Sequence, residues 1–294
     1  MHWAQLTITT SQEAAEAVAN YLFELKARGV EFKDCPASTT RIIAYYPLDD
    51  SVGAKVQQLR DFLAQFPAWG ITPQPAQVSL KQVESEAWEE AWKAVFPPQR
   101  IGKRFLIAPT WEDIAPAEAD ILIRLDPGMA FGTGYHPTTR LSLELLEDAV
   151  KPNHYVADIG TGSGILAIAA VKLGAKHVDA IELDATAIPV AASNFRKNGV
   201  NTQVRLLQGD GLKAQQGTYH VIVGNILTKV LLPLIPDCAS RLHSEGHVIF
   251  SGILETELRQ VKSVLEARGF QCLQVALEAE DDITWVAVLA RRLF

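Results

Sequence analysis

The carboxyl-terminal half of this 294-residue chain alternates between strand-like and helix-like segments, and this pattern most constrains the fold. The apolar runs that predict strands are Tyr155–Ile159, Val178–Leu183, Val204–Gln208, Tyr219–Val223 and His247–Ser251. Helices are predicted between these strands, at Ile165–Leu173, Ala185–Asn198, Thr228–Leu242 and Glu255–Arg268. Strands joined through helices pair in parallel by right-handed crossovers, so we expect an α/β domain whose sheet is covered on both faces.

The last stretch of the chain departs from this alternation. The sequence "FQCLQVALEAEDDITWVAVLARRL" contains two apolar strands that are joined at Glu280–Asp282 with no helix between them. Strands joined by a short turn pair antiparallel. We therefore predict that the parallel sheet ends in a closing hairpin, which adds one antiparallel strand to it.

A different order of elements precedes this domain. The strand-like "HWAQLTITT" is followed by a helical pattern that Ser11 can cap, then by two strands, a second helix and a last strand in "AQVSLKQV". The order βαββαβ predicts a smaller α+β domain of the ferredoxin-like kind. We place this domain at residues 1–80, a linker helix that carries Trp88 and Trp92 at residues 81–100, and the large domain at residues 101–294.

Composition and charge limit the classes of function. The formal net charge of −7 argues against a surface built mainly to bind nucleic acid, which needs clustered Lys and Arg. The three cysteines lie far apart without a CxxC pair, so we expect neither a metal site nor a disulfide framework. The sequence shows no signal-peptide pattern and no apolar run of membrane-spanning length, so we expect a cytoplasmic protein without a membrane partner.

A glycine-rich turn, Gly160-Thr161-Gly162-Ser163-Gly164, joins the first strand of the alternation to its helix. Glycine permits positive φ and a close approach of the backbone to a ligand, and the helix that follows presents free N–H groups to it. Glu182 ends the next strand, where a carboxylate can hold the hydroxyls of an adenosine ribose. The turn fits either a nicotinamide dinucleotide or S-adenosylmethionine.

Three features favour S-adenosylmethionine. Asp158 lies just ahead of the glycines, where its carboxylate would repel a pyrophosphate but suits a ligand that carries an ammonium and a sulfonium. Asp210 lies just past the third strand, where it can accept a hydrogen bond from an adenine amino group. The closing hairpin is typical of S-adenosylmethionine-dependent methyltransferase sheets rather than of dehydrogenase sheets. We therefore predict S-adenosylmethionine as the cofactor, with Asp158, Gly160, Gly162, Glu182 and Asp210 in its site.

Four stretches closely resemble the bacterial ribosomal protein L11 methyltransferase family: "AWEEAWKAVFPPQRIGKRFLIAPTW", "DPGMAFGTGYHPTT", "DIGTGSGILAIAAVKLGA" and "VGNILTKVLLPL". The resemblance implies a Rossmann-like class I methyltransferase that methylates lysine side chains and the N-terminal amine of a large-subunit ribosomal protein, L11. It also implies a mobile N-terminal domain that grips the substrate protein. We further expect a monomer that requires no nucleic acid. The cofactor contacts that it implies are Thr139, Gly160, Glu182 and Asn225.

The reaction gives Asn225 a predicted catalytic role. An amine must be neutral to accept a methyl group, whereas a free lysine has a pKa of about 10.4, so burial must lower it and an acceptor must aim its lone pair. Asn225 follows the fourth strand and can orient this amine. Thr139 can contact the cofactor, although it can also cap the helix that begins at Arg140.

The stretch "FGTGYH" has further predicted roles. Gly132 and Gly134 can let it fold over the ligand as a lid, and Phe131 can stack on the adenine or pack in the core. His136 is assigned no proton transfer, because the adjacent Pro137 indicates a structural turn.

Two alternatives remain open at this point. A methyltransferase of the same fold could act on another protein or on a small amine. In a different class, the glycine turn could serve an NAD-dependent oxidoreductase or a non-catalytic nucleotide-binding module.

Overall fold

The computed structural model describes residues 2–27, 29–35, 39–49, 51–69, 73, 75–84, 96–126, 134–213, 217–280 and 282–293. These residues form two units, one up to Pro97 and the other from Pro98 onward. Each unit buries a hydrophobic core of its own. The N-terminal core draws on residues between Ala4 and Phe66, and the C-terminal cores draw on residues from Ile101 onward.

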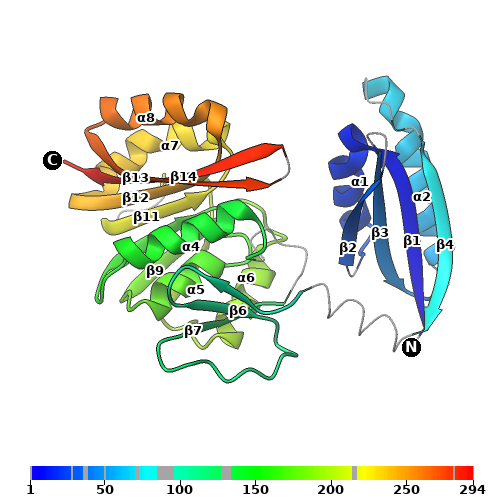
Figure 1. Cartoon of the computed structure of the whole chain (residues 1–294), viewed down its shortest axis with the longest axis horizontal. Helices are drawn as coiled ribbons and strands as arrows, with labels where there is room; N and C mark the ends of the chain where they lie inside the picture. The colour runs from blue at the N-terminus through cyan, green and yellow to red at the C-terminus, as the bar shows by residue number, and fades with distance from the viewer. Residues whose placement is uncertain are drawn as a thin grey trace. The chain divides into compact units, whose positions relative to one another are not determined.

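The N-terminal unit consists of an antiparallel sheet with helices on one face (Figure 1). Its elements are β1 (His2–Ser11), α1 (Gln12–Glu24), β2 (Gly29–Cys35), β3 (Thr39–Pro47), α2 (Val52–Gln65), the 3-10 helix η1 (Phe66–Trp69) and β4 (Gln77–Glu84). The strand order β2-β3-β1-β4 is the predicted ferredoxin-like arrangement. Ser11 caps α1, since its hydroxyl accepts a hydrogen bond from the Ala14 N–H at 3.3 Å. Tyr21 of α1 stacks on Phe62 of α2, which joins the two helices.

A mixed sheet forms the centre of the C-terminal unit, with the strand order β10-β9-β8-β11-β12-β14-β13. The strands are β8 (Tyr155–Ile159), β9 (His177–Glu182), β10 (Val204–Gln208), β11 (Tyr219–Asn225), β12 (Leu242–Leu254), β13 (Phe270–Glu280) and β14 (Ile283–Arg292). The pairings from β10 to β12 are parallel, whereas β14 pairs antiparallel with both β12 and β13. The predicted α/β class and its closing antiparallel hairpin are confirmed.

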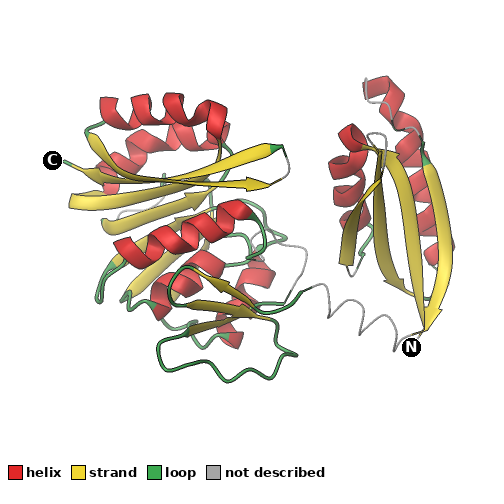
Figure 2. Ribbon diagram, in the orientation of Figure 1, coloured by secondary structure: helices red, strands yellow, loops and turns green. Residues whose placement is uncertain are grey.

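Helices cover both faces of this sheet (Figure 2). They are α4 (Pro137–Ala149), α5 (Ile165–Lys172), α6 (Ile188–Lys197), α7 (Thr228–Arg241) and α8 (Leu258–Ala267), with the 3-10 helix η2 (Glu255–Glu257) ahead of α8. In β8, Val156 belongs to the core that includes α4 and α5, whereas Ala157 belongs to the core that includes α7 and α8. Because both faces are buried, the strands read as continuous apolar runs rather than as alternating ones.

A second, short sheet was not predicted from the sequence. It consists of β5 (Gln99–Ile101), β6 (Phe105–Ala108) and β7 (Ile121–Arg124), and it packs into the same core as α4 and α5. Glu147 of α4 fixes the turn between β5 and β6, because its carboxylate accepts hydrogen bonds from the backbone N–H groups of Lys103 and Arg104 at 2.8 and 2.7 Å. Strands of three or four residues are too short to show a reliable period in the sequence.

The predicted linker helix over residues 81–100 needs a correction at both ends. β4 continues to Glu84, past the boundary at residue 80, and β5 begins at Gln99. The backbone there stays extended because β1 pairs with β4 along its whole length, as far as His2 opposite Glu84. Residues 85–95, which include Trp88 and Trp92, lie outside the described residues.

Candidate active site

Parallel strands bring the predicted site residues to one edge of the large sheet. In the sheet register, Ile159 at the end of β8 lies beside Ile181 of β9 and beside Gly224 of β11. Asn225, the last residue of β11, lies beside Ser251 of β12. The segments that follow these strand ends therefore converge at the carboxyl edge, which is where open α/β sheets bind their ligands.

The glycine turn after β8 depends on backbone that other residues cannot adopt without strain. Gly160 and Gly164 have φ values of +70° and +87°. A Cβ at Gly160 would lie 2.6 Å from a methyl carbon of Ile226, and a Cβ at Gly164 would lie 2.4 Å from the ring of Phe195. The glycines thus let the turn pass close to neighbouring segments before α5 begins.

Hydrogen bonds to β9 and from α6 hold this turn in place. The N–H groups of Gly160 and Thr161 both donate to the Ile181 carbonyl, at 2.8 and 3.0 Å. The side-chain amide of Asn194, on α6, donates to the Ser163 carbonyl at 2.8 Å in a buried position. The sequence prediction did not include Thr161 or Asn194. Thr161 could have been suspected from its place inside the turn, but nothing in the sequence singles out Asn194.

Glu182 joins β9 to the glycine turn. One carboxylate oxygen accepts the Gly162 N–H at 2.8 Å, and the other accepts the Asp184 N–H at 2.9 Å. A carboxylate can accept about four hydrogen bonds, so Glu182 retains capacity for the hydroxyls of a ligand. Gly162 and Glu182, both predicted site residues, are therefore in direct contact.

Asp158 is fully buried at the end of β8. Its Oδ2 accepts hydrogen bonds from the Thr161 hydroxyl at 2.5 Å and from the Ala167 N–H at 3.1 Å. Its Oδ1 is also buried, and it has no hydrogen-bond partner among the described residues. Burial raises the pKa of Asp158 to about 7, against the lowering effect of the two hydrogen bonds and with a contribution from the Glu182 charge.

Asn225 and Thr139 meet across the sheet edge. The Asn225 side-chain amide donates to the Thr139 hydroxyl at 3.3 Å, so the end of β11 contacts the first turn of α4. Thr139 is fully buried, and the cap of α4 is His136, whose Nδ1 accepts the Thr138 N–H at 3.3 Å. Capping therefore accounts for His136 and leaves the Thr139 hydroxyl available to Asn225.

Asp210 lies apart from these contacts. It follows β10 at the same edge, where the Gly209 N–H donates to the Glu182 carbonyl at 2.9 Å. Its side chain is exposed and forms an ion pair with Lys213 at 2.5 Å. Of the predicted lid and stacking residues, Gly132 and Phe131 lie outside the described residues, whereas Gly134 is described and has a φ of +92°.

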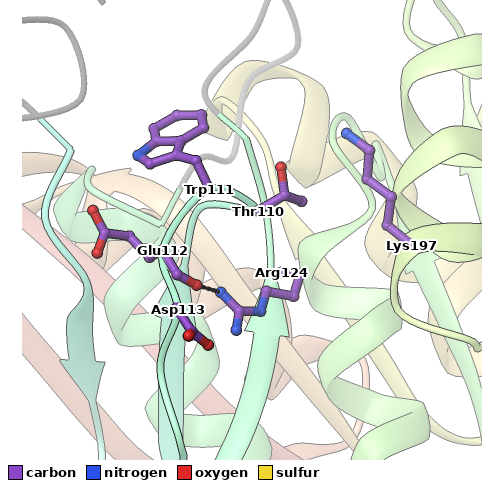
Figure 3. A pocket seen from close by; sticks show the side chains of 6 residues that line it. All are labelled: Thr110, Trp111, Glu112, Asp113, Arg124 and Lys197. Carbon is purple, nitrogen blue, oxygen red and sulfur yellow. Dashed lines mark hydrogen bonds between the residues drawn. The ribbon is translucent and has the colours of Figure 1, made fainter. Parts of the chain in front are cut away.

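A separate cavity of about 370 Å³ opens elsewhere in the C-terminal unit (Figure 3). It is lined by Thr110, Trp111, Glu112, Asp113, Arg124 and Lys197. Both of its cations are already engaged: Arg124 donates to the Glu112 carbonyl, as Figure 3 shows, and Lys197 pairs with Asp126 at 2.8 Å. None of the predicted site residues lines this cavity, and we assign it no ligand.

The described part of the chain meets the requirements of neither a metal site nor a membrane-spanning helix. No group of three or more His, Cys, Asp or Glu residues there is arranged to hold a metal ion. No helix there has both the length and the apolar character that a membrane crossing requires.

Several known proteins match this chain over nearly its full length and share one name. The family model described as ribosomal protein L11 methyltransferase matches residues 2–292. Two proteins named ribosomal protein L11 methyltransferase, from Caldanaerobacter subterraneus subsp. tengcongensis and from Desulfitobacterium hafniense, are 36% and 38% identical to this chain. Each alignment covers 99% of this chain, and they cover 99% and 98% of the two relatives.

A solved structure agrees with this assignment. The crystal structure of ribosomal protein L11 methylase from Lactobacillus delbrueckii subsp. bulgaricus is 39% identical, with a TM-score of 0.62. The match covers 68% of this chain and all of that chain. The chain therefore belongs to the ribosomal protein L11 methyltransferase family and is a protein methyltransferase of the class I fold.

Proposed function

We propose that this protein transfers methyl groups from S-adenosylmethionine to amino groups of ribosomal protein L11, on lysine side chains and at the N-terminus. The observation that carries the cofactor is Asp158, which keeps a buried carboxylate oxygen without a hydrogen-bond partner among the described residues, beside the glycine turn. A buried carboxylate of this kind is stabilised when a cation pairs with it. The ammonium of S-adenosylmethionine has the charge that this position requires.

The other predicted residues fit the remaining parts of the cofactor. Glu182 would accept the ribose hydroxyls, and Gly160 and Gly162 would let the backbone approach them. Asp210 would accept the adenine amino group, after exchanging its exposed ion pair with Lys213 for that contact. Thr139 and Asn225, which already contact each other, would bind the methionine part.

S-adenosylmethionine, when bound, supplies an electrophilic methyl group on its sulfonium. The residues of this chain then have three tasks: to hold the amine in line with that methyl group, to exclude water and to keep the amine neutral. Asn225 is the proposed catalytic residue, because its side-chain oxygen can accept a hydrogen bond from the amine and so direct the lone pair. Burial at the edge of the sheet lowers the pKa of the incoming amine, which favours its neutral form.

The relatives support the proposed substrate, because they are named for ribosomal protein L11 and align with this chain over almost their whole length. We propose that the N-terminal unit binds that protein, that the enzyme acts as a monomer in the cytoplasm, and that the reaction needs neither nucleic acid nor a membrane. The proposed arrangement is a substrate-binding domain, a connecting segment and a methyltransferase domain from Pro98 onward.

Mass spectrometry of L11 after incubation with enzyme and S-adenosylmethionine tests the proposal. We expect mass gains of whole methyl groups on amines with wild-type enzyme. Asn225→Ala should lower kcat by about a hundredfold, because loss of orientation alone can cost that much. The matched control is Asn201→Ala, an exposed asparagine, which should keep wild-type activity. Unmodified L11 with wild-type enzyme would overturn the proposed substrate, and full activity in Asn225→Ala would overturn its catalytic role.

A further inference from the structure

Ser251 lies next to Asn225, the proposed catalytic residue, on the neighbouring strand. It is fully buried in β12, directly beside Asn225 in the sheet register. Its hydroxyl donates to the Thr138 carbonyl of α4 at 3.0 Å, and the Val286 carbonyl is a more distant acceptor at 3.5 Å. Ser251 thus links the end of β12 to the first turn of α4.

This link and the contact made by Asn225 reach successive residues of the same helix. Ser251 holds the carbonyl of Thr138, and Asn225 contacts the hydroxyl of Thr139 at 3.3 Å. The first turn of α4 is therefore tied to two adjacent strands at the edge where the cofactor is proposed to bind. If the Ser251 hydroxyl is lost, the start of α4 keeps its contacts to β13 and β14, where Arg140 donates to Glu278 and the His136 ring lies against that of Trp285. It loses the side-chain hydrogen bond to β12, which lies directly beside the Thr139–Asn225 contact.

The backbone after Ser251 fits closely against the segment that follows Asn225. The Ile226 N–H donates to the Ser251 carbonyl at 3.2 Å. Gly252 has a φ of +79°, and a Cβ there would lie 2.6 Å from the Ile226 carbonyl oxygen. The end of β12 thus fixes both sides of the Asn225 position: the backbone that carries it and the helix that it contacts.

We propose that Ser251 is a positioning residue for methyl transfer, which holds the first turn of α4 so that Thr139 stays against Asn225. This inference rests on the proposed function, in which Asn225 orients the amine. Ser251 acts through Thr138 and Asn225 and contacts neither reactant.

Ser142 provides a matched control for this inference. Its hydroxyl donates to the same Thr138 carbonyl at 2.7 Å, and it is equally buried. Its bond, however, lies within α4, so its loss does not separate the helix from the sheet. Ser142→Ala and Ser251→Ala each remove one buried hydroxyl that donates to the Thr138 carbonyl. Only Ser251→Ala removes a hydrogen bond between α4 and β12.

Steady-state kinetics with L11 and S-adenosylmethionine, with a thermal melt of each variant, test the inference. We expect Ser251→Ala to lower kcat by about tenfold, because small misplacements of catalytic groups are costly. Ser142→Ala should keep kcat within about twofold of the wild type while losing a similar few degrees of Tm. Equal kcat values in the two variants would show that Ser251 is merely structural.

Two additions keep the outcome decisive. Ser251→Cys keeps the size of the side chain but has a weaker hydrogen-bond donor, so its kcat should lie between those of wild type and Ser251→Ala. If Ser251→Ala does not fold, Ser251→Cys and Ser142→Cys replace the two alanine variants in the comparison. The NMR signals of the Asn225 side-chain amide should shift in the Ser251 variants but not in the Ser142 variants. This readout needs no substrate, so it separates failure of this inference from failure of the proposed function.

Discussion

Asp158 is a fully buried ionisable side chain beside the glycine turn. Its buried Oδ1 lacks a partner among the described residues, and its pKa is raised to about 7, mainly by burial. Near neutral pH, the free enzyme therefore holds this carboxyl partly protonated. A cationic ligand must displace that proton to form an ion pair, so binding and titration are linked.

The affinity for S-adenosylmethionine should consequently depend on pH. As the pH falls below about 7, Asp158 takes up a proton in the free enzyme, and the affinity should drop about tenfold per unit. The ammonium of the ligand stays charged in this range, since α-amino groups titrate near about 8. Isothermal calorimetry between pH 5.5 and pH 7 measures this slope. Asp158→Asn should bind more weakly and without the slope, whereas Asp148→Asn, an exposed aspartate on α4, should keep it. A wild-type affinity that is constant over this range would contradict the role of Asp158.

Single residues were predictable from the sequence where a motif fixes their place in the chain. Glu182 and Asn225 each end a strand and Asp158 lies one residue before the end of β8, and the register of parallel strands brings strand ends together. Asn194 and Ser251 were not predictable, because their partners lie 31 and 113 residues away in the sequence. Only the three-dimensional packing of α6 and β12 against the turn and α4 makes these polar groups part of the site.

Elements were predictable to the extent that burial marks them. β10 has the predicted bounds, and β8 does too, because buried strands form apolar runs with clear ends. β12 extends from Leu242 to Leu254, well beyond the predicted His247–Ser251. Leu242 already pairs with Tyr219 of β11, and the register then shifts before His247 pairs with Val221, an irregularity that the apolar pattern does not show. β5, β6 and β7 escaped prediction because their few residues gain order from packing on α4 and α5.

The opposite edge of the large sheet carries a cluster of histidines. His154 stacks on His220 with ring centroids 4.6 Å apart, and His220 lies 4.4 Å from His243. The Nδ1 atoms of His154 and His220 accept the backbone N–H groups of Lys151 and Tyr155, which keeps both rings neutral. Burial lowers the pKa of His154 to about 4, helped by His220, Lys151, His247 and His243. The pKa values of His220 and His247 are also lowered by burial; Lys151 and Arg291 add to this for His247, whereas Glu245 opposes it.

The histidine cluster should make the C-terminal unit sensitive to acid. A histidine in the unfolded chain has a pKa of about 6.5, whereas His154 in the folded chain has a pKa of about 4. Between these two pH values the unfolded chain therefore binds a proton at His154 and the folded chain does not. Stability should therefore fall as the pH drops through this window, and Tm should decrease by at least about 3 °C. His154→Asn keeps an acceptor for the Lys151 N–H but cannot be charged, so its Tm should fall less. Melting curves at several pH values measure the decrease of Tm in the wild type and in His154→Asn. An equal decrease in the two proteins would rule out the contribution of His154.

At the scale of the whole molecule, the described chain forms two units with separate cores. Every predicted cofactor residue lies in the C-terminal unit, between Thr139 and Asn225. The N-terminal unit contributes an antiparallel sheet with two packed helices among its described residues, and no predicted cofactor contact lies in it. A sequence can predict such a division because the order of elements changes from βαββαβ to βα alternation.

Removal of residues 1–97 should separate cofactor binding from substrate recognition. The truncated protein retains the C-terminal cores, so we expect its Kd for S-adenosylmethionine to stay within about twofold of wild type. Its kcat/KM for L11 should fall by about a hundredfold or more, because contacts remote from the reacting amine contribute to transition-state binding. Calorimetry and methylation assays on the same preparation measure the two effects. Cofactor binding lost together with activity would mean that the N-terminal unit supports the fold of the site, whereas full activity on L11 would mean that the C-terminal unit recognises its substrate alone.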